Sequence, residues 1–275
     1  MRLSKAFAAS FAALALFGGA VQAAEFRPSA DAIRGHMSFL ADDLLQGREA
    51  GTPGYDIAAA YVRGRFIELG LKPAGDAGTF YQRVPLAQFR PQGEGTAALI
   101  ARDGTRTELK FGDEWLPSSW GSEVNLTAPL VFAGYGIVQQ GRDDYAGLDV
   151  RGKIVVLLPG APTAMNSEVR AHVASGRTKR QLAAERGAAG VLFLSTPRGE
   201  QAFPFANGRR GLQGWSTTWA DAEGKPFTPG AVPVGSVSAA VAARLFEGAR
   251  RTYAQVVADA EKPEGVVRGF PLRGS

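Results

Sequence analysis

The stretch 153-KIVVLLPGAPTAMNSEVRAHVASGRTKRQLAAERGAAGVLFL-194 carries the clearest fold signal of this 275-residue chain. Its two ends, 153–158 and 190–194, are short continuous apolar runs, which are typical of strands covered on both faces. A polar helical stretch, 177–186, lies between them and stops at Gly187. Strand, helix and strand at this spacing predict a βαβ unit, which is normally parallel and right-handed.

The flanking segments predict more strands and one short helix. Residues 97–101 and 107–111 indicate a hairpin with Asp103-Gly104 in its turn. Two further runs, 129–135 and 231–237, are strand candidates, and the Ala-rich run 239–247 favours a helix. Residues 203–229 are rich in Gly, Pro and Trp and predict a long loop.

Nearer the N-terminus, residues 31–71 have a helical pattern. Ser29 or Asp31 is placed to cap a first helix, and Gly47 and Gly51 end it. Four apolar residues fall on one face of that helix: Ile33, Met37, Leu40 and Leu44.

A second helix is predicted to follow at once. Thr52 is the expected N-cap, with Pro53 at the first helical position, where its missing N–H costs nothing. Gly70 is placed to end the helix in the left-handed conformation, and Pro73 prevents its continuation. The apolar face of this helix is formed by Ala58, Val62, Phe66 and Leu69.

The first 23 residues have the three parts of a secretory signal peptide. Arg2 and Lys5 precede an uncharged run, 6–18, and the small residues Val21 and Ala23 form a cleavage site. The run is shorter than the roughly 20 residues that span a bilayer. We therefore expect cleavage after Ala23 and an exported protein, periplasmic or extracellular, with no membrane association afterwards.

The composition excludes several classes of function. The chain has no cysteine, so it has no disulfide, no thiolate nucleophile or metal ligand, and no lipid anchor of the lipoprotein type. Loss of Arg2 and Lys5 with the signal leaves 29 basic residues against 26 acidic ones, a net charge of +3. This mild excess contains no long basic run, so no nucleic-acid partner is expected.

Motifs of hydrolytic chemistry are sparse. The chain has no His-Glu-x-x-His and no Gly-x-Ser-x-Gly, and its two histidines are His36 and His172. The acidic residues Asp42, Asp43 and Glu49 form with His36 the one cluster to weigh as a metal site. Asp43 lies two helical turns from His36, too far for both to hold one ion, so His36 is interpreted as a helix-surface residue.

Three other groups of residues are candidates for a binding site. Gly134-Tyr-Gly136 lacks the spacing and the following helix of a dinucleotide site. The carboxylates of Asp143, Asp144 and Asp149 suit a hard cation such as calcium, although turn carboxylates are more often solvated. The aromatic residues of the 203–229 segment either form a binding patch or pin the loop to the body, and both interpretations stay open: Phe203, Phe205, Trp215, Trp219 and Phe227.

The opening residues, 33–73, resemble those of secreted zinc aminopeptidases of metallopeptidase family 28. Glycines, caps and apolar positions agree in order: His36, Phe39-Leu40-Ala41-Asp42-Asp43, Leu45, Gly47-Arg48, Gly51-Thr52, Gly54, Ala59, Tyr61, Phe66, Gly70-Leu71 and Pro73.

Residues 129–246 resemble the protease-associated (PA) domain that is inserted into many of those enzymes. The more diagnostic part is a Gly-Lys-Ile strand followed by a Gly-Ala-Ala-Gly-Val strand. The matching pieces are Val131-Phe-Ala-Gly-Tyr-Gly136, Asp144-Tyr145, Gly147-Leu-Asp-Val-Arg-Gly-Lys-Ile154, Lys179, Ala183-Ala184, Gly187-Ala-Ala-Gly-Val-Leu-Phe193 and 233–238.

The resemblance implies an α/β fold in which an N-terminal helical segment precedes a PA-type β-rich domain with a βαβ unit. The expected division is a signal peptide at 1–23, a peptidase-like helical segment at 24–95, a PA domain at 96–250 and a tail at 251–275. In that family the zinc ligands lie on a following catalytic half, and no position here matches their motifs. We therefore assign no catalytic, cofactor-binding or metal-binding residue, and zinc belongs to the resembled family.

The function that the resemblance implies is that of the N-terminal portion of a secreted zinc aminopeptidase, truncated or encoded apart from its catalytic half and not catalytic alone. Its partners would be peptide substrate or that downstream half. An alternative is a standalone exported PA-domain module that binds peptide or protein. A third, weaker alternative is an enzyme with an unrecognised site.

Overall fold

The computed structural model describes residues 27–118, 123–139 and 141–273. The predicted signal peptide, 1–23, lies outside them. The chain divides into two compact units, Met1–Arg83 (unit 1) and Val84–Ser275 (unit 2). Across the described part of both units, every helix is too short or too polar to cross a bilayer.

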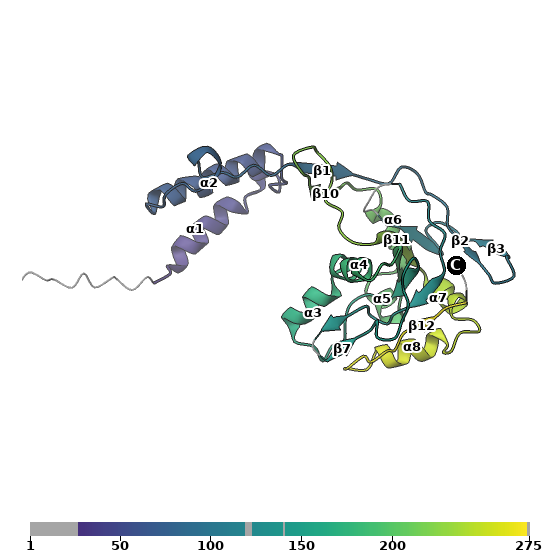
Figure 1. Ribbon diagram of the computed structural model, residues 1–275. Helices are drawn as coiled ribbons and strands as arrows, with labels where there is room; N and C mark the ends of the chain where they lie inside the picture. The colour runs from purple at the N-terminus through teal and green to yellow at the C-terminus, as the bar shows by residue number, and fades with distance from the viewer. Residues whose placement is uncertain (1–26, 119–122, 140, 274–275) are drawn as a thin grey trace, which may run out of the picture. The chain divides into compact units, whose positions relative to one another are not determined.

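Unit 1 is a pair of helices with two short 3-10 turns (Figure 1). Its elements are α1 (Ala30–Leu40), η1 (Asp43–Leu45), α2 (Pro53–Glu68) and η2 (Asp76–Gly78). The hydroxyl of Ser29 accepts a hydrogen bond from the Ala32 N–H at 3.3 Å, and that of Thr52 accepts one from the Tyr55 N–H at 3.4 Å. Both caps confirm the sequence prediction, since each satisfies an N–H that the first helical turn leaves free.

The first helix ends earlier than its apolar pattern predicts. α1 stops at Leu40, and Leu44 falls in η1 with its side chain 86% exposed. The cause is Asp42, whose carboxylate accepts a hydrogen bond from the Leu44 N–H at 2.9 Å and starts a new turn. Leu45 is buried against Gly54 of α2, where a Cβ would meet the Leu45 carbonyl oxygen, so only glycine fits.

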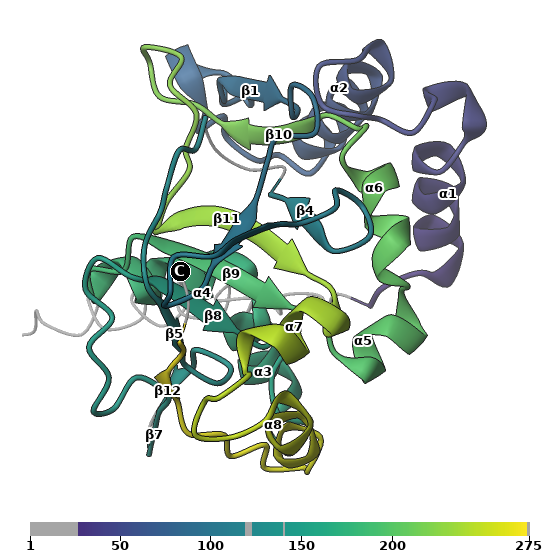
Figure 2. The ribbon, with the colours of Figure 1, turned by 90° about the vertical axis from the view of Figure 1, so that its right-hand side faces the viewer.

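Unit 2 is built on a six-stranded mixed sheet (Figure 2). Its strands, in order across the sheet, are β12 (Phe270–Pro271), β5 (Leu130–Phe132), β8 (Ile154–Leu157), β9 (Gly190–Leu194), β11 (Val232–Val237) and β4 (Trp115–Pro117). The four central strands are parallel, while β12 and β4 are antiparallel to their neighbours. The predicted βαβ unit is confirmed as β8, α4 (Gly176–Glu185) and β9.

Side chains alternate between the two faces of this sheet, and both faces are covered. On one face, residues such as Phe132 and Val156 join the core formed with α3 (Ser167–Ala174), α7 (Ala239–Leu245) and α8 (Tyr253–Ala260). On the other face, Val155 and Val191 pack with Ala183 of α4. This explains why the strand sequences are continuously apolar instead of alternating.

Three two-stranded pairs complete the strands: β1 (Leu86–Phe89) with β10 (Ser216–Trp219), β2 (Ala98–Ile100) with β3 (Arg106–Glu108), and β6 (Val138–Gln139) with β7 (Arg142–Asp143). The β2–β3 pair is the predicted hairpin around Asp103-Gly104. The predicted loop 203–229 instead contains η3 (Phe205–Asn207), α6 (Gly208–Gly211) and β10, preceded by α5 (Pro197–Ala202). The sequence did not predict β10 because its partner strand, β1, is distant in the chain: the paired residues Gln88 and Thr217 are 129 residues apart.

The expected tail, 251–275, does not leave unit 2 as a tail. Its described part forms α8 and β12, and β12 pairs with β5. Val256, Val257, Phe270 and Leu272 are buried in the same core as β5 and β8. Because these residues fill one face of the sheet, the body of unit 2 extends beyond residue 250.

Candidate functional site

The structure pairs His36 with a tyrosine and not with acidic neighbours. His36 Nδ1 lies 2.7 Å from the Tyr61 hydroxyl, between α1 and α2. Asp42 caps η1, as described above. Among the described residues, no group of three or more His, Asp or Glu side chains comes close enough to hold a metal ion.

The three carboxylates considered for a cation have separate environments. Asp149 is an exposed partner of the Lys153 ammonium at 2.9 Å, and hydrogen bonds from this lysine lower the pKa of Asp149. Asp143 accepts a hydrogen bond from the Tyr145 N–H at 2.9 Å, and Asp144 is buried. Asp143 and Asp149 line one pocket, but Asp144 does not, and no three potential metal ligands converge among the described residues, so the calcium interpretation is not supported by this geometry.

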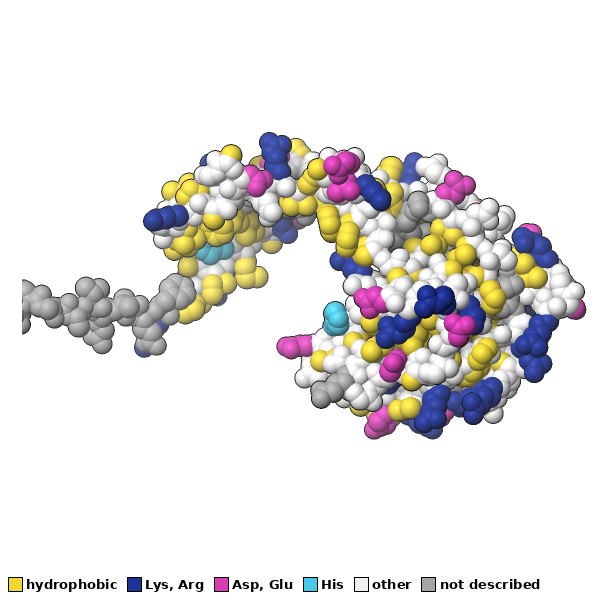
Figure 3. All heavy atoms as spheres, viewed as in Figure 1, with side chains coloured by type: hydrophobic (Ala, Val, Ile, Leu, Met, Phe, Trp, Pro, Cys, Tyr) yellow, Lys and Arg dark blue, Asp and Glu magenta, His cyan; other side chains and the backbone are white. Residues whose placement is uncertain are grey.

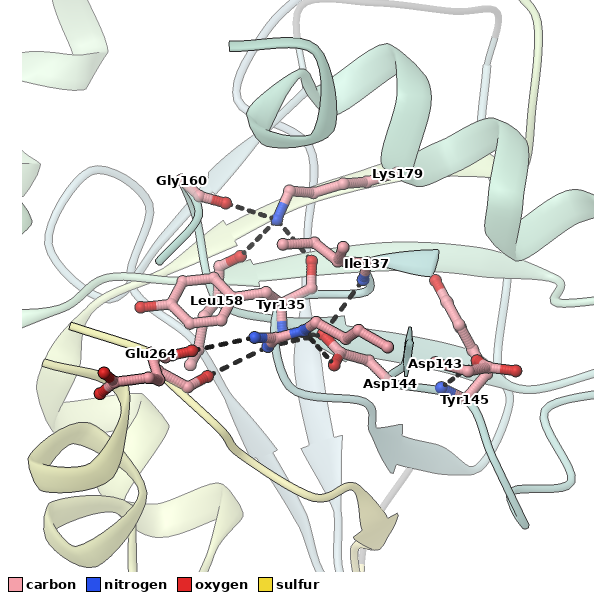
Figure 4. Close-up of polar contacts among 11 residues, drawn as sticks. Tyr135, Ile137, Asp143, Asp144, Tyr145, Leu158, Gly160, Lys179 and Glu264 are labelled. Atoms are coloured by element: carbon pink, nitrogen blue, oxygen red, sulfur yellow. Dashed lines mark hydrogen bonds and ion pairs between the residues drawn. The ribbon is translucent and has the colours of Figure 1, made fainter. Parts of the chain in front are cut away.

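Asp144 holds the Gly-Tyr-Gly loop that follows β5 (Figure 4). Its Oδ2 accepts hydrogen bonds from the N–H groups of Tyr135 and Ile137, both at 3.1 Å. The Arg142 guanidinium donates to both carboxylate oxygens, at 2.8 and 3.2 Å. Gly136 has φ of +67° and faces Leu157, so a side chain there would be strained and would clash.

Lys179 of α4 lies on the other side of this loop and is fully buried. Its ammonium donates to the carbonyl oxygens of Tyr135, Leu158 and Gly160, the last two at 3.1 and 2.8 Å (Figure 4). Nζ lies 5.4 Å from the centroid of the Tyr135 ring, whose face attracts a cation. We call Lys179, Tyr135, Arg142 and Asp144 the Lys179 centre.

Burial sets the ionisation of this centre. It lowers the pKa of Lys179 to about 7, an effect that the carboxylate of Asp144 opposes. Burial raises the pKa of the Tyr135 and Tyr145 hydroxyls, which therefore stay protonated. Three carbonyl acceptors match the three N–H bonds of an ammonium, so the protonated lysine satisfies the site completely.

The Lys179 centre is a structural lock and not a catalytic group. Lys179 has no exposed surface, and each of its N–H bonds is committed to a carbonyl oxygen. Its hydrogen bonds hold α4 against the segments that follow β5 and β8, where the bonded carbonyl groups lie outside regular helices and strands. Two features of the sequence pointed to it: Lys179 is among the positions that resemble the PA domain, and it is the one lysine of a helix that packs on a buried strand.

Unit 1 carries an apolar groove of about 550 Å³ along α2. Arg48 and Arg63 are its charged residues, and neither forms an ion pair within the described parts of the chain. The other lining residues are Leu40, Tyr55, Ala58, Ala59, Val62, Phe66, Phe80 and Tyr81. Figure 3 shows hydrophobic side chains gathered on the surface over α1 and α2. The face predicted for α2 is thus present, and within unit 1 it is only partly covered.

The aromatic residues of the 203–229 segment do not form one patch. Phe205 lies in η3, and Phe203 is 60% exposed apart from any ring contact among the described residues. Trp219 stacks on Phe227 with ring centroids 4.2 Å apart. Trp215 lies under the Arg90 guanidinium at 4.7 Å. Trp219 is the last residue of β10 and Trp215 directly precedes this strand, and both indoles remain about half exposed.

Known proteins resemble this chain over part of its length or at low similarity. Residues 126–245 match the model of the PA domain. Among solved structures, the aminopeptidase of Aneurinibacillus sp. strain AM-1 is 18% identical over 90% of this chain, with a TM-score of 0.35. BSAP, a zinc aminopeptidase from Bacillus subtilis, is 18% identical over 88% of it, with a TM-score of 0.26. No curated protein matches the chain.

The matched structures are much longer than this chain, which covers 44% and 42% of their respective lengths. Such low identity and TM-scores show neither an activity nor a site in this chain. The PA match is firmer, because it contains the parallel strands β5, β8, β9 and β11 together with the Lys179 centre. This chain is therefore an α/β protein that contains a PA domain at residues 126–245.

Proposed function

We propose that this chain is the exported, non-catalytic portion of a zinc aminopeptidase-type peptidase. Unit 2 carries a PA domain that controls how peptide substrate reaches the catalytic half, and unit 1 docks on that half. The observation that carries the proposal is the PA domain match over residues 126–245. Export follows from the signal-peptide pattern of residues 1–23.

The surface of unit 1 supports a docking role. No residue of α1 is buried, and in α2 only Gly54 is. Large apolar side chains are instead exposed on several sides, among them Met37, Ile57 and Ile67 at 64%, 48% and 57%. Contiguous exposed apolar surface of this kind usually marks an interaction site.

The zinc of the resembled enzymes has no ligand set in the described part of this chain. A zinc site needs several nitrogen, oxygen or sulfur ligands around one point. His36 is engaged by Tyr61, and no three potential ligands converge among the residues that the structure describes. In this proposal the contribution of the chain is to position peptide and partner.

A reconstitution assay tests this proposal. The mature chain, residues 24–275, is purified with and without the polypeptide encoded directly downstream, and zinc-dependent release of leucine from leucine p-nitroanilide is measured. We expect no release by the chain alone, and at least about tenfold more release by the pair than by the downstream polypeptide alone, a free-energy difference of about 1.4 kcal/mol. Equal release with and without this chain would contradict the proposal.

The alternative is a standalone exported PA-domain module that binds peptide or protein. It is favoured by the complete core of unit 2, whose sheet is covered on both faces without any second polypeptide. A downstream region without a reading frame that carries His-x-Asp and Asp-Asp motifs would favour this alternative. A third outcome, stoichiometric zinc in the dialysed chain with activity lost in His36→Ala, would show an enzyme with an unrecognised site.

A further inference from the structure

A row of side chains on the β1–β10 pair has the form of a binding surface. In the antiparallel register Leu86 lies opposite Trp219 and Gln88 lies opposite Thr217. Extending that register by one pair on the same face places Arg90 opposite Trp215, in agreement with the 4.7 Å separation of their groups. We call these six residues the indole row; they come from two segments that lie far apart in the chain.

The indole row is the outer face of its pair of strands. Trp215, Leu86 and Trp219 are 58%, 47% and 45% exposed. The residues between them point the other way, since Thr218 is buried and Ala87 is half-buried. The alternation is that of a strand with one covered face, so the row faces outward because of the register.

Neighbouring contacts hold the row in place. Phe227 stacks on one side of the Trp219 ring, and the Phe227 N–H donates to the Trp219 carbonyl at 2.9 Å. The Thr218 hydroxyl donates to the Phe227 carbonyl at 3.0 Å. Across the pair, the Gln88 side-chain amide donates to the Thr217 hydroxyl at 3.3 Å. Side chains that are already ordered lose less entropy when a ligand binds.

We propose that the indole row binds an extended peptide with two apolar side chains four residues apart and a carboxylate at one end. This inference rests on the proposed role in substrate access and names the class of peptide. Trp215 and Trp219 are four positions apart along the chain, a span of roughly 13 Å at about 3.3 Å per residue. An extended peptide has the same rise and period, so its residues four apart reach both indoles.

The polar members of the row specify the rest of the peptide. Gln88 and Thr217 lie between the two indoles, so the side chain midway between the apolar ones is small or polar. Arg90 is the charged residue of the row, and it forms no ion pair with the residues that the structure describes. Its guanidinium favours a carboxylate at the Trp215 end.

Titration calorimetry with a synthetic peptide tests the inference. The probe is acetyl-Phe-Ala-Thr-Ala-Phe-Ala-Glu-amide, added to the mature chain. We expect binding with Kd below ~1 mM, weakened at least about tenfold in both Trp215→Ala and Trp219→Ala. The matched control is Phe203→Ala, which removes an exposed aromatic outside the row and should leave Kd unchanged. Thermal melting verifies that each variant is folded.

The expected contact between Arg90 and the carboxylate of the peptide is tested separately by reversing the charge of each partner. Replacing Glu by Lys in the probe should weaken binding to the wild-type chain, and Arg90→Glu should reverse that preference. Any of four results would overturn the inference. The wild-type chain does not bind the peptide, or Kd is unchanged in both tryptophan variants. Alternatively, Arg90→Glu does not reverse the preference, or a neutral oligosaccharide binds in place of the peptide. If reconstituted peptidase activity nevertheless survives, only this inference fails; if the peptide binds but no activity is reconstituted, only the proposed function fails.

Discussion

Unit 1 and unit 2 show opposite balances between local and tertiary stabilisation. The helices of unit 1 have good caps, Ser29 and Thr52, yet bury almost nothing. The four central strands of unit 2 are short, between three and six residues long. Every residue of one of them, β8, is nevertheless buried. Capping therefore sets where a helix begins, whereas burial determines how strongly the helix is held in the fold.

The largest effect should come from placing a charge in the unit 2 core. Val156→Asp puts an unpaired carboxylate at a position with no exposure, between β5 and β9. We expect loss of the cooperative thermal transition of unit 2, because a buried unpaired charge is very unfavourable. Circular dichroism melting measures this. Val266→Asp, at a position 67% exposed, is the control and should melt like the wild type.

The next effect tests the Lys179 centre. Lys179→Met keeps an apolar stem but leaves the three carbonyl oxygens of Tyr135, Leu158 and Gly160 without a donor. Each unsatisfied buried group costs about 1–3 kcal/mol, so we expect the loss of one donor to three groups to lower the free energy of unfolding by at least about 3 kcal/mol. Urea denaturation measures it. Lys225→Met changes an exposed lysine and should cost less than about 0.5 kcal/mol.

Hydrogen exchange compares the two units directly. We expect amides of residues 31–71 to open at free energies at least about 3 kcal/mol lower than those of β8 and β9, because exchange protection follows burial. In the reconstituted pair the protection of α1 and α2 should rise toward that of unit 2. Equal protection of both units in the isolated chain would mean that unit 1 already has a full partner, and the docking role would lose its physical support.

The smallest expected effect is a pH dependence specific to unit 2. Burial lowers the pKa of Lys179 to about 7 in the fold, whereas its ordinary value is 10.5. Between these values the unfolded chain binds more protons than the folded one, so stability should rise with pH, by at most about 1.4 kcal/mol per pH unit. Urea denaturation between pH 7 and 9 measures the slope.

Lys179→Met is the comparison for this slope. The variant lacks the titrating group, so its stability should change less with pH than that of the wild type over the same range. Identical slopes in the two proteins would show that Lys179 keeps its proton throughout, held by its three carbonyl acceptors.

Local patterns determined much of this protein. The continuous apolar runs at 153–158 and 190–194 and the polar helix between them predicted the parallel β8–α4–β9 unit, because strands covered on both faces need no polar side. Thr52 and Pro53 fixed the start of α2, and Gly70 its end with φ of +70°. These features follow from contacts within a few residues of each other.

Only the tertiary structure decided the features that join distant segments. β12 pairs with β5 across more than a hundred residues, and α8, which begins at a capping box formed by Thr252 and Gln255, packs into a core whose strands lie far away in the sequence. The indole row exists because β10 pairs with β1, and the same register, extended by one pair on that face, puts Trp215 on the side of Trp219. Lys179 is a lock only because three carbonyl groups from two loops converge on its ammonium. The spacing of residues in the sequence sets the period of a strand or helix. Which distant residues contact a given side chain, and whether that side chain faces inward or outward, depends on the packing of the whole unit.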